Sequence, residues 1–225
     1  MGLFDKKYCS ICGQKIKMLQ NTRLQDGNLC RECRGKLSPF YMVDFMAPTV
    51  GEVAGHLAYR ERNRDELRNF HATECFGEDC RMFIDGVGRK FVLATEEELA
   101  AGSPDVFDIS AVVRAEAAVS EQENEHRNSD SDSEEYYTYS YSVMLELELA
   151  HPTLQLVGYQ VHPKAIYSGR GRIDMERMRQ VYEGTAEINR SIFASIAGNT
   201  RKVQEEYLKY YSIAQDMVKV LERER

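Results

Sequence analysis

The sequence predicts an α+β protein with a small cysteine-rich N-terminal module, a connecting helix, an antiparallel β-rich domain and C-terminal helices. Three observations predict this: two Cys-x-x-Cys pairs near the N-terminus, alternation of apolar and polar residues in the middle of the chain, and helical periodicity at its end. The chain therefore divides into a module at 1–40, hereafter the head, a connector and helix at 41–69, and a sheet domain with C-terminal helices at 70–225.

The head carries four cysteines with the spacing of a metal site. Cys9 and Cys12 form one pair and Cys30 and Cys33 the other, with 17 residues between the pairs. Two such turns can place four thiolates around one ion in a tetrahedral shell. Because the N-terminus shows no signal-peptide pattern, metal thiolates explain this spacing better than disulfides do. We expect one zinc per chain in a zinc-ribbon-like module, with iron or free thiols as the alternatives.

The ligand set predicts a structural metal rather than a catalytic one. Four sulfur ligands close the coordination sphere, whereas a catalytic zinc keeps a position open for water. The first histidine of the chain is His56, outside the head. The turn sequence at Gln25 to Asn28 predicts a short hairpin between the cysteine pairs. In so small a segment the metal is expected to supply most of the folding free energy.

The head is basic although the protein is acidic. The net charge of the chain is −7, but eight basic and three acidic residues give the head a charge of +5. Four thiolates around one zinc would leave about +3, a mild basic surface. Nucleic-acid binding through residues 1–40 is therefore an alternative and not the leading hypothesis. The head residues expected at this surface are Lys15, Lys17, Arg23, Arg31, Arg34 and the turn at Asp26 to Asn28.

The segment after the head predicts an ordered connector at 38–48 and then a helix. Thr49 and Glu52 form a T-x-x-E capping box, and the apolar face of the helix begins at Val50 and Val53. His56 is expected on the helix surface. The charged half at 60–68 predicts a solvated face held by ion pairs three or four residues apart.

Strand periodicity begins after Phe70. Residues 70–76, 80–85 and 89–94 predict a meander, and 102–110 is expected to be a loop. Residues 120–135 are acidic and almost without apolar side chains, which predicts a flexible hairpin tip. The clearest strand follows, with Tyr137, Tyr139 and Tyr141 continuing into valine and leucine on one face. This row predicts a core face with an exposed end; stacking on nucleobases is the alternative.

The C-terminal part predicts two helices, at 174–196 and 200–222. The second helix carries apolar residues in a heptad pattern, which allows a coiled-coil homo-oligomer. Its apolar stripe is wider than a coiled-coil seam, however, and this favours docking on the sheet of the same chain.

Several stretches together resemble a known family. The sequences "MGLFDKKYCSICG", "DGNLCREC" and "LAYRERNRDELRNFHATECFG" are similar to a family of small bacterial proteins with a domain of unknown function and a predicted N-terminal zinc finger. The resemblance implies metal ligation by Cys9, Cys12, Cys30 and Cys33, and it implies no reaction. The element order of the body is similar to that of pleckstrin-homology-like domains, which implies lipid or peptide binding.

Other candidate chemistry is sparse. Cys75 and Cys80 flank a predicted hairpin near His71, so a redox pair or a second metal site is the alternative to two ordinary strand cysteines. We find no phosphate-binding loop, nucleophile elbow or zinc-protease pattern, and therefore expect no enzyme. No apolar stretch approaches the roughly 20 residues of a membrane span, so we expect a cytoplasmic protein.

These observations predict a non-enzymatic adaptor held in shape by zinc, with a protein as the expected partner. A nucleic-acid-binding regulator that uses the basic head is the alternative, and a lipid- or peptide-binding module is the third hypothesis.

Overall fold

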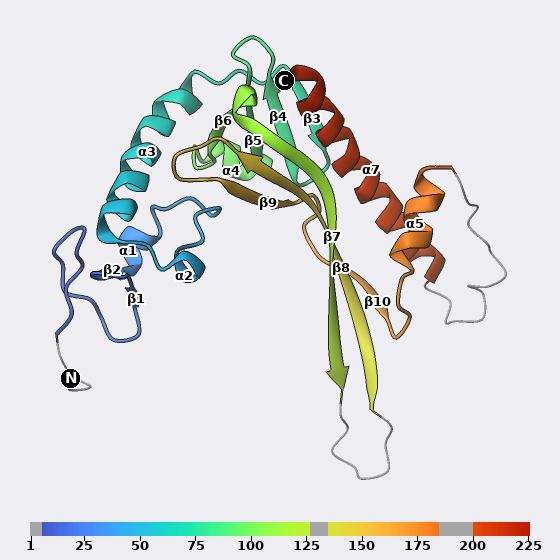
Figure 1. Ribbon diagram of the computed structural model, residues 1–225, viewed down its shortest axis with the longest axis horizontal. Helices are drawn as coiled ribbons and strands as arrows, with labels where there is room; N and C mark the ends of the chain where they lie inside the picture. Colours follow the sequence, from blue (N-terminus) through green and yellow to red (C-terminus); the bar gives the residue numbers. More distant parts are fainter. Residues whose placement is uncertain (1–5, 127–134, 185–199) are drawn as a thin grey trace.

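A computed structural model describes residues 6–126, 135–184 and 200–225. The head lies at one end of the molecule, and a long helix joins it to a body of antiparallel strands (Figure 1). A two-stranded ribbon projects from the body, and a C-terminal helix packs beside its base. This mixture of helices and antiparallel sheets confirms the predicted α+β class.

The head is built on the predicted hairpin. Strands β1 (Asn21–Arg23) and β2 (Asn28–Cys30) pair antiparallel, with Asn21 opposite Cys30. The short helix α1 (Arg31–Arg34) follows directly, and α2 (Val43–Met46) lies in the connector.

Helix α3 (Val50–Arg68) begins with the predicted capping box. The Thr49 hydroxyl accepts a hydrogen bond from the Glu52 amide at 3.2 Å, and the Glu52 carboxylate accepts one from the Thr49 amide at 2.7 Å. The prediction that His56 lies on the surface is wrong, because its side chain is fully buried. His56 follows Val53 by three residues and therefore shares its inward face.

The burial of His56 is possible because its ring is hydrogen-bonded on both nitrogens. Nε2 accepts from the Ser38 amide at 3.1 Å, so Nδ1 carries the proton and donates to the Thr153 hydroxyl at 3.0 Å. The Ser38 hydroxyl donates to the buried carboxylate of Asp105 at 2.6 Å, and Arg60 pairs with the same carboxylate at 2.6 Å. These contacts join the connector, α3 and two loops of the body.

The prediction of a solvated face for 60–68 is correct only in part. Asp65 and Arg68 form an exposed ion pair at 2.7 Å, as expected for such a face. Asn63, however, is buried. Its side-chain nitrogen donates to the Pro104 carbonyl, and its side-chain oxygen accepts from the Val106 amide. Polar side chains point inward here because the loop before β6 has backbone groups that need partners.

The first sheet is the predicted meander extended by one strand. Its order is β3 (Glu74–Gly77), β4 (Arg81–Asp85), β5 (Lys90–Ala94) and β6 (Val106–Asp108). The segment expected to be a loop thus contains a strand, β6, whose Val106 and Phe107 are buried on opposite faces. Helix α4 (Glu96–Ala100) precedes β6, and a 3-10 turn, η1 (Ile109–Ala111), follows it.

The second sheet is organised around β8 (Tyr136–Leu149). Strand β7 (Val112–His126) pairs with it along its length, while β9 (Leu156–Gln160) and β10 (Ile166–Gly169) share its other edge. The distal part of β7 and β8 forms the projecting ribbon (Figure 1).

The prediction of a flexible acidic tip is wrong for Glu121 to His126, which belong to β7. Cross-strand hydrogen bonds and an ion pair between Glu121 and Arg172 hold this polar segment. Residues 127–134 of the predicted tip lie outside the described residues. The tyrosine row behaves as predicted: Tyr141 is fully buried, whereas Tyr137 is 40% exposed.

Helix α7 (Thr200–Glu224) docks on the strands of its own chain. Its inner residues Ala214, Met217 and Leu221 are fully buried, and it contacts β3, β7, β8 and β10. The apolar stripe of α7 therefore packs inside the chain, and a homo-oligomer through this helix stays a prediction. The other predicted helix is represented by α5 (Met175–Tyr182), and residues 185–196 lie outside the described part.

The resemblance to pleckstrin-homology-like domains is not confirmed, because none of the three sheets of the described residues closes on itself. The predicted boundaries at 40 and 69 stay predictions. Within the described ranges, no helix is long and apolar enough to cross a membrane.

The buried His56 should make stability depend on pH. Burial lowers its pKa from 6.5 to about 4, so the unfolded chain binds a proton at a higher pH than the folded chain does. Stability from neutral His56 is thus complete above pH 6.5 and is lost as pH falls toward about 4. We expect this residue to lower the free energy of unfolding by about 2–3 kcal/mol over that window.

Urea denaturation of the wild type and of His56→Gln, at about pH 7 and about pH 4.5, measures this effect. Glutamine keeps hydrogen-bonding groups but does not titrate, so the variant should lose less stability on acidification. Equal losses in the two proteins would show that His56 is not responsible.

Candidate metal centre

The first cysteine pair lies in a tight turn that the local sequence favours. The Gly13 amide donates to the Cys9 carbonyl at 2.8 Å, and the Cys9 amide donates to the Gln14 carbonyl at 2.8 Å. Gly13 has a φ of +72°, a conformation that costs glycine little because it has no side chain. The turn directs Cys9 inward, whereas Cys12 is exposed.

The second pair lies where β2 passes into α1. Cys30 is the last residue of β2 and the N-cap of α1, and its sulfur accepts from the Cys33 amide at 3.4 Å. The Cys30 amide donates to the sulfur of Cys9, also at 3.4 Å. Backbone amides therefore point at cysteine sulfurs both within one pair and across the two pairs. Such contacts stabilise thiolates.

The fold brings all four predicted cysteines together. The sulfur atoms of Cys9, Cys12, Cys30 and Cys33 all lie within 4.8 Å of one another, and none of these cysteines is in a disulfide. The Cys12 and Cys30 sulfurs are 3.8 Å apart. A tetrahedral ion with metal–sulfur bonds of about 2.3 Å requires about 3.8 Å between sulfurs, so this spacing fits a metal.

The surroundings of Cys9, Cys30 and Cys33 shift the pKa values of their thiols in different directions. Burial alone would raise the pKa of Cys9, but hydrogen bonds from the amides of Cys12, Cys30 and Ile11 outweigh it and lower the pKa to about 6. Burial raises the pKa of Cys33, as do the neighbouring thiols, and burial also raises that of Cys30. A divalent ion bound here would have to displace these protons.

Contacts across the hairpin turn fix the cysteine site against α3. The Ser10 amide donates to the Asn28 carbonyl at 2.8 Å, and the Asp26 carboxylate accepts from the Val50 amide at 2.7 Å. Gly27 lies between these groups: a Cβ atom there would come within 2.4 Å of the Ser10 hydroxyl and 2.6 Å of a Val50 methyl. The first turn, the hairpin and α3 can approach this closely only because residue 27 has no side chain.

The cysteines also belong to the main hydrophobic core. Cys9, Cys30 and Cys33 are buried beside Leu29, and this cluster continues without a break through Val53 into the sheets and α7. The cysteine site is thus part of the molecule's core.

The outer surface of the head carries cations that form no ion pair with any described residue. Only Arg34 among the described basic residues of the head forms an ion pair, with Asp44 at 2.5 Å, and it also donates to the Thr22 hydroxyl at 3.1 Å. Lys15, Lys17 and Arg23, predicted to form the surface, are exposed. The head cations that are exposed and form no ion pair within the described residues are Lys6, Lys7, Lys15, Lys17, Arg23, Arg31 and Lys36.

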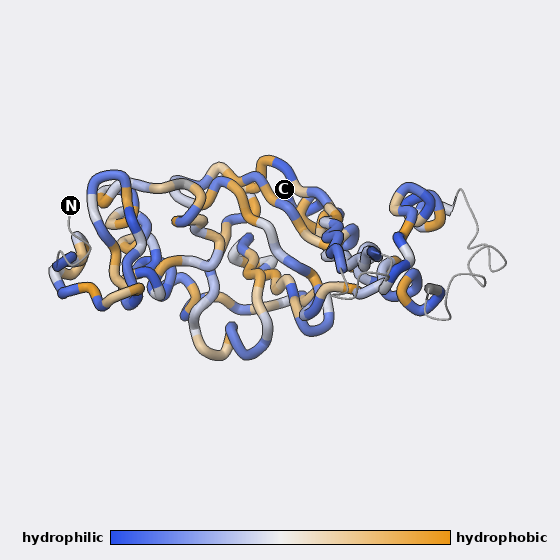
Figure 2. Tube along the Cα trace, turned by 90° about the horizontal axis from the view of Figure 1, so that it is seen from below, coloured by the Kyte–Doolittle hydropathy of each residue, from blue (hydrophilic) through white to orange (hydrophobic). Residues whose placement is uncertain are grey.

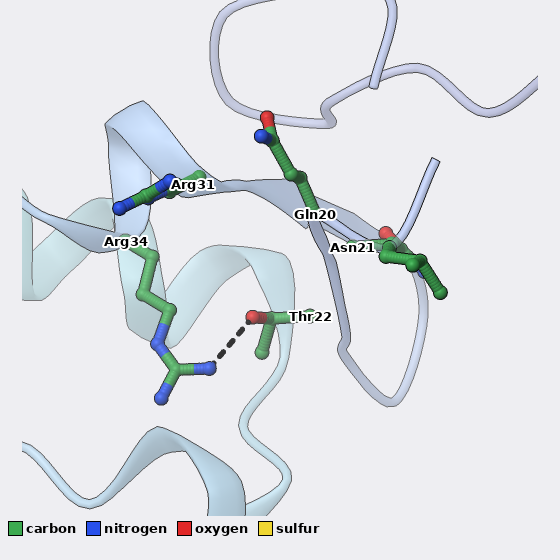
Figure 3. Close-up of a pocket in the computed structure, with 6 residues that line it drawn as sticks. Gln20, Asn21, Thr22, Arg31 and Arg34 are labelled. Carbon is green, nitrogen blue, oxygen red and sulfur yellow. Dashed lines mark hydrogen bonds between the residues drawn. The ribbon is translucent and has the colours of Figure 1, made fainter. Parts of the chain in front are cut away.

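Two features of this surface were not predicted from the sequence. Met18 is 77% exposed and Leu19 is fully exposed, in a turn where Leu19 has a φ of +64°. A polar pocket of about 340 Å³ lies next to them, between the segment that leads into β1 and helix α1 (Figure 3). The apolar pair "ML" directly after Lys17 is visible in the sequence, but periodicity does not reveal a turn tip.

The structure gives no support to a second metal site at the predicted hairpin. Cys75 is exposed, Cys80 is partly exposed, and both thiols are free. In the part of the chain that the structure describes, neither joins a cluster of three or more metal-binding side chains. His71 donates only its backbone amide, to Asp85.

Comparison with known proteins finds a match only in the N-terminal part of the chain. A family model described as a domain of unknown function, DUF4428, matches residues 7–56, which include all four clustered cysteines and the start of α3. This confirms the resemblance for the head and connector. No curated protein and no solved structure matches the chain.

Replacement of Gly27 should disturb the site through packing alone. Gly27→Ala introduces a Cβ that must displace Ser10 or Val50, so we expect a loss of about 1–3 kcal/mol in the free energy of unfolding. Faster release of bound metal to a chromogenic chelator should accompany it.

Gly51→Ala is the matched control. Gly51 is exposed in α3, and a Cβ there meets nothing closer than 3.9 Å. Alanine should leave stability unchanged or raise it by about 0.5–1 kcal/mol, because it favours helix. Equal effects of the two substitutions would refute the role given to Gly27.

Proposed function

We propose that this protein is a non-enzymatic adaptor whose head is held in shape by one structural zinc ion. The observation that carries the proposal is the convergence of four cysteine sulfurs within 4.8 Å of one another, at a site where three of the cysteines, Cys9, Cys30 and Cys33, belong to the continuous core. When bound there, zinc would replace hydrophobic contacts that a segment of this size cannot supply. Cys9, Cys12, Cys30 and Cys33 would be its ligands.

The ligand chemistry favours zinc and argues against catalysis at this centre. Four thiolates in a single compact cluster suit a lone tetrahedral ion, and iron is the competing metal. Four protein ligands leave no position for water or substrate, so the ion would not activate either. The chemistry of the site therefore supports a role in shape rather than in reaction.

A surface at the junction of head and body supports a protein as partner. An apolar pocket of about 550 Å³ lies between the connector, the first turns of α3 and the turn between β8 and β9. Two of the residues that line it are exposed: Met42 is 43% exposed and Leu156 is 62% exposed. Large apolar side chains around a concave surface are typical of protein-binding sites.

Nucleic-acid binding by the head is the second candidate. It is favoured by exposed cations such as Lys15, Lys17 and Arg31, which form no ion pair in the described part of the chain. Such binding would weaken steeply with salt, because each phosphate contact releases counterions.

Elemental analysis of the purified full chain tests the metal. We expect one zinc per chain, and its loss in Cys30→Ser, since three thiolates hold zinc less tightly than four. Cys75→Ser is the matched control, because Cys75 is exposed and outside the cluster, and it should retain the zinc. A chain without metal, or with an iron chromophore, would refute the zinc assignment.

The partner surface is tested by cross-linking in cells that express the protein. Leu156→Asp should abolish capture of a discrete protein partner, because it places a charge on an apolar contact. Val87→Asp is the control, since Val87 is 91% exposed on the turn between β4 and β5. A partner captured equally by both variants would locate the protein-binding surface elsewhere.

A further inference from the structure

We propose that the turn at Lys17 to Gln20, together with Arg31, docks the head on an anionic phospholipid surface. The inference rests on the proposed interaction function and assigns a partner to the head, separate from the protein surface at Leu156.

The tip of this turn exposes apolar side chains in an unfavourable conformation. The Gln20 amide donates to the Lys17 carbonyl at 3.1 Å, which makes Met18 and Leu19 the central residues of a four-residue turn. Leu19 has a φ of +64°, where such turns usually carry glycine or asparagine. Its side chain is fully exposed, so it contributes no packing within the described structure that would offset the strain.

Cations surround this apolar tip. Lys15 and Lys17 precede it in sequence, and Arg31 faces it across the polar pocket. All three are exposed and make no ion pair within the described residues. Basic residues beside an apolar tip match the two layers of a membrane surface, because anionic headgroups attract the cations while the acyl boundary accepts the apolar side chains.

The pocket beside Leu19 provides a place for a headgroup phosphate. Figure 3 shows Arg31 and Arg34 of α1 on one side and Gln20, Asn21 and Thr22 on the other. The Arg34 guanidinium is already engaged by Asp44 and Thr22, whereas Arg31 is free to bind a phosphate oxygen. The head as a whole combines hydrophilic and hydrophobic stretches (Figure 2).

The aliphatic character of the tip favours lipid over nucleic acid. Single-stranded nucleic acids stack on aromatic side chains, and duplexes are held mainly through phosphates. Neither uses a fully exposed leucine, whereas insertion into the headgroup boundary buries it. A membrane thus accounts for both the cations and the apolar pair.

Vesicle co-sedimentation of the full, metal-loaded chain tests the proposal. Binding is expected to phosphatidylcholine vesicles that contain phosphatidylglycerol, and not to phosphatidylcholine alone. Leu19→Gly should weaken binding roughly tenfold, about the factor for burial of one leucine side chain. Glycine accepts the positive φ, so this variant should fold at least as well as the wild type.

Two matched controls separate the tip from general effects. Val87→Ser removes another highly exposed apolar side chain, one that lies in the body, and should leave binding unchanged. Arg31→Gln should weaken binding severalfold, more than Arg62→Gln, which removes an exposed cation from α3.

Failure to bind anionic vesicles would overturn the inference, while zinc content and capture through Leu156 would still support the adaptor function. Equal binding by Leu19→Gly and wild type would also overturn it. Tight, salt-sensitive binding to duplex DNA without vesicle binding would assign the head to nucleic acid instead.

Discussion

The head depends on one constraint: two turns separated by 17 residues must bring their sulfurs to the spacing of a single ion. The hairpin of β1 and β2 supplies the return path, and the amide of Cys30 points at the sulfur of Cys9. Gly27 then allows the hairpin turn to lie against α3. Because Cys9, Cys30 and Cys33 are part of the continuous core, loss of an ion bound by the four cysteines would remove support from the junction with the body as well as from the head.

A second set of contacts fixes the direction in which α3 leaves the head. His56 is hydrogen-bonded to Ser38 and Thr153. Asp105 is bound by Ser38 and by Arg60, so these polar groups, which could not be buried singly, all have partners across the interface between α3 and the body. Such a network tolerates few alternative arrangements, since any shift leaves a buried group without a partner. Apolar packing alone would permit more sliding. The orientation of the head relative to the sheets is therefore specified by hydrogen bonds.

The sequence predicts those parts of the fold that local pattern controls. The cysteine spacing, the capping box at Thr49 and the alternation through Tyr141 are local signals, and all three features occur as expected. His56 and Asn63 were misplaced because their partners, Ser38, Thr153 and the loop before β6, are distant in sequence. Tertiary contacts decide whether a polar residue is buried, and one sequence does not reveal them. Strand β6 was missed because three residues are too short for a period to appear.

Strand β8 has a consequence for the accuracy of folding. Its inner half carries Val143, Leu145 and Leu147 toward the core and pairs with β7 and β9. Strand β10 pairs with the adjoining residues from Tyr139 to Tyr141. A slip of one residue between β7 and β8 would turn the apolar side chains of one of the two strands toward water. Wrong alignments are therefore strongly disfavoured at the base of the ribbon. The far end of the ribbon, beyond the β10 contact at Tyr139, carries mainly polar side chains and has little preference of its own. Its alignment is therefore set by the pairing at the base. The amino-acid composition of the far end can vary without loss of the pairing between β7 and β8.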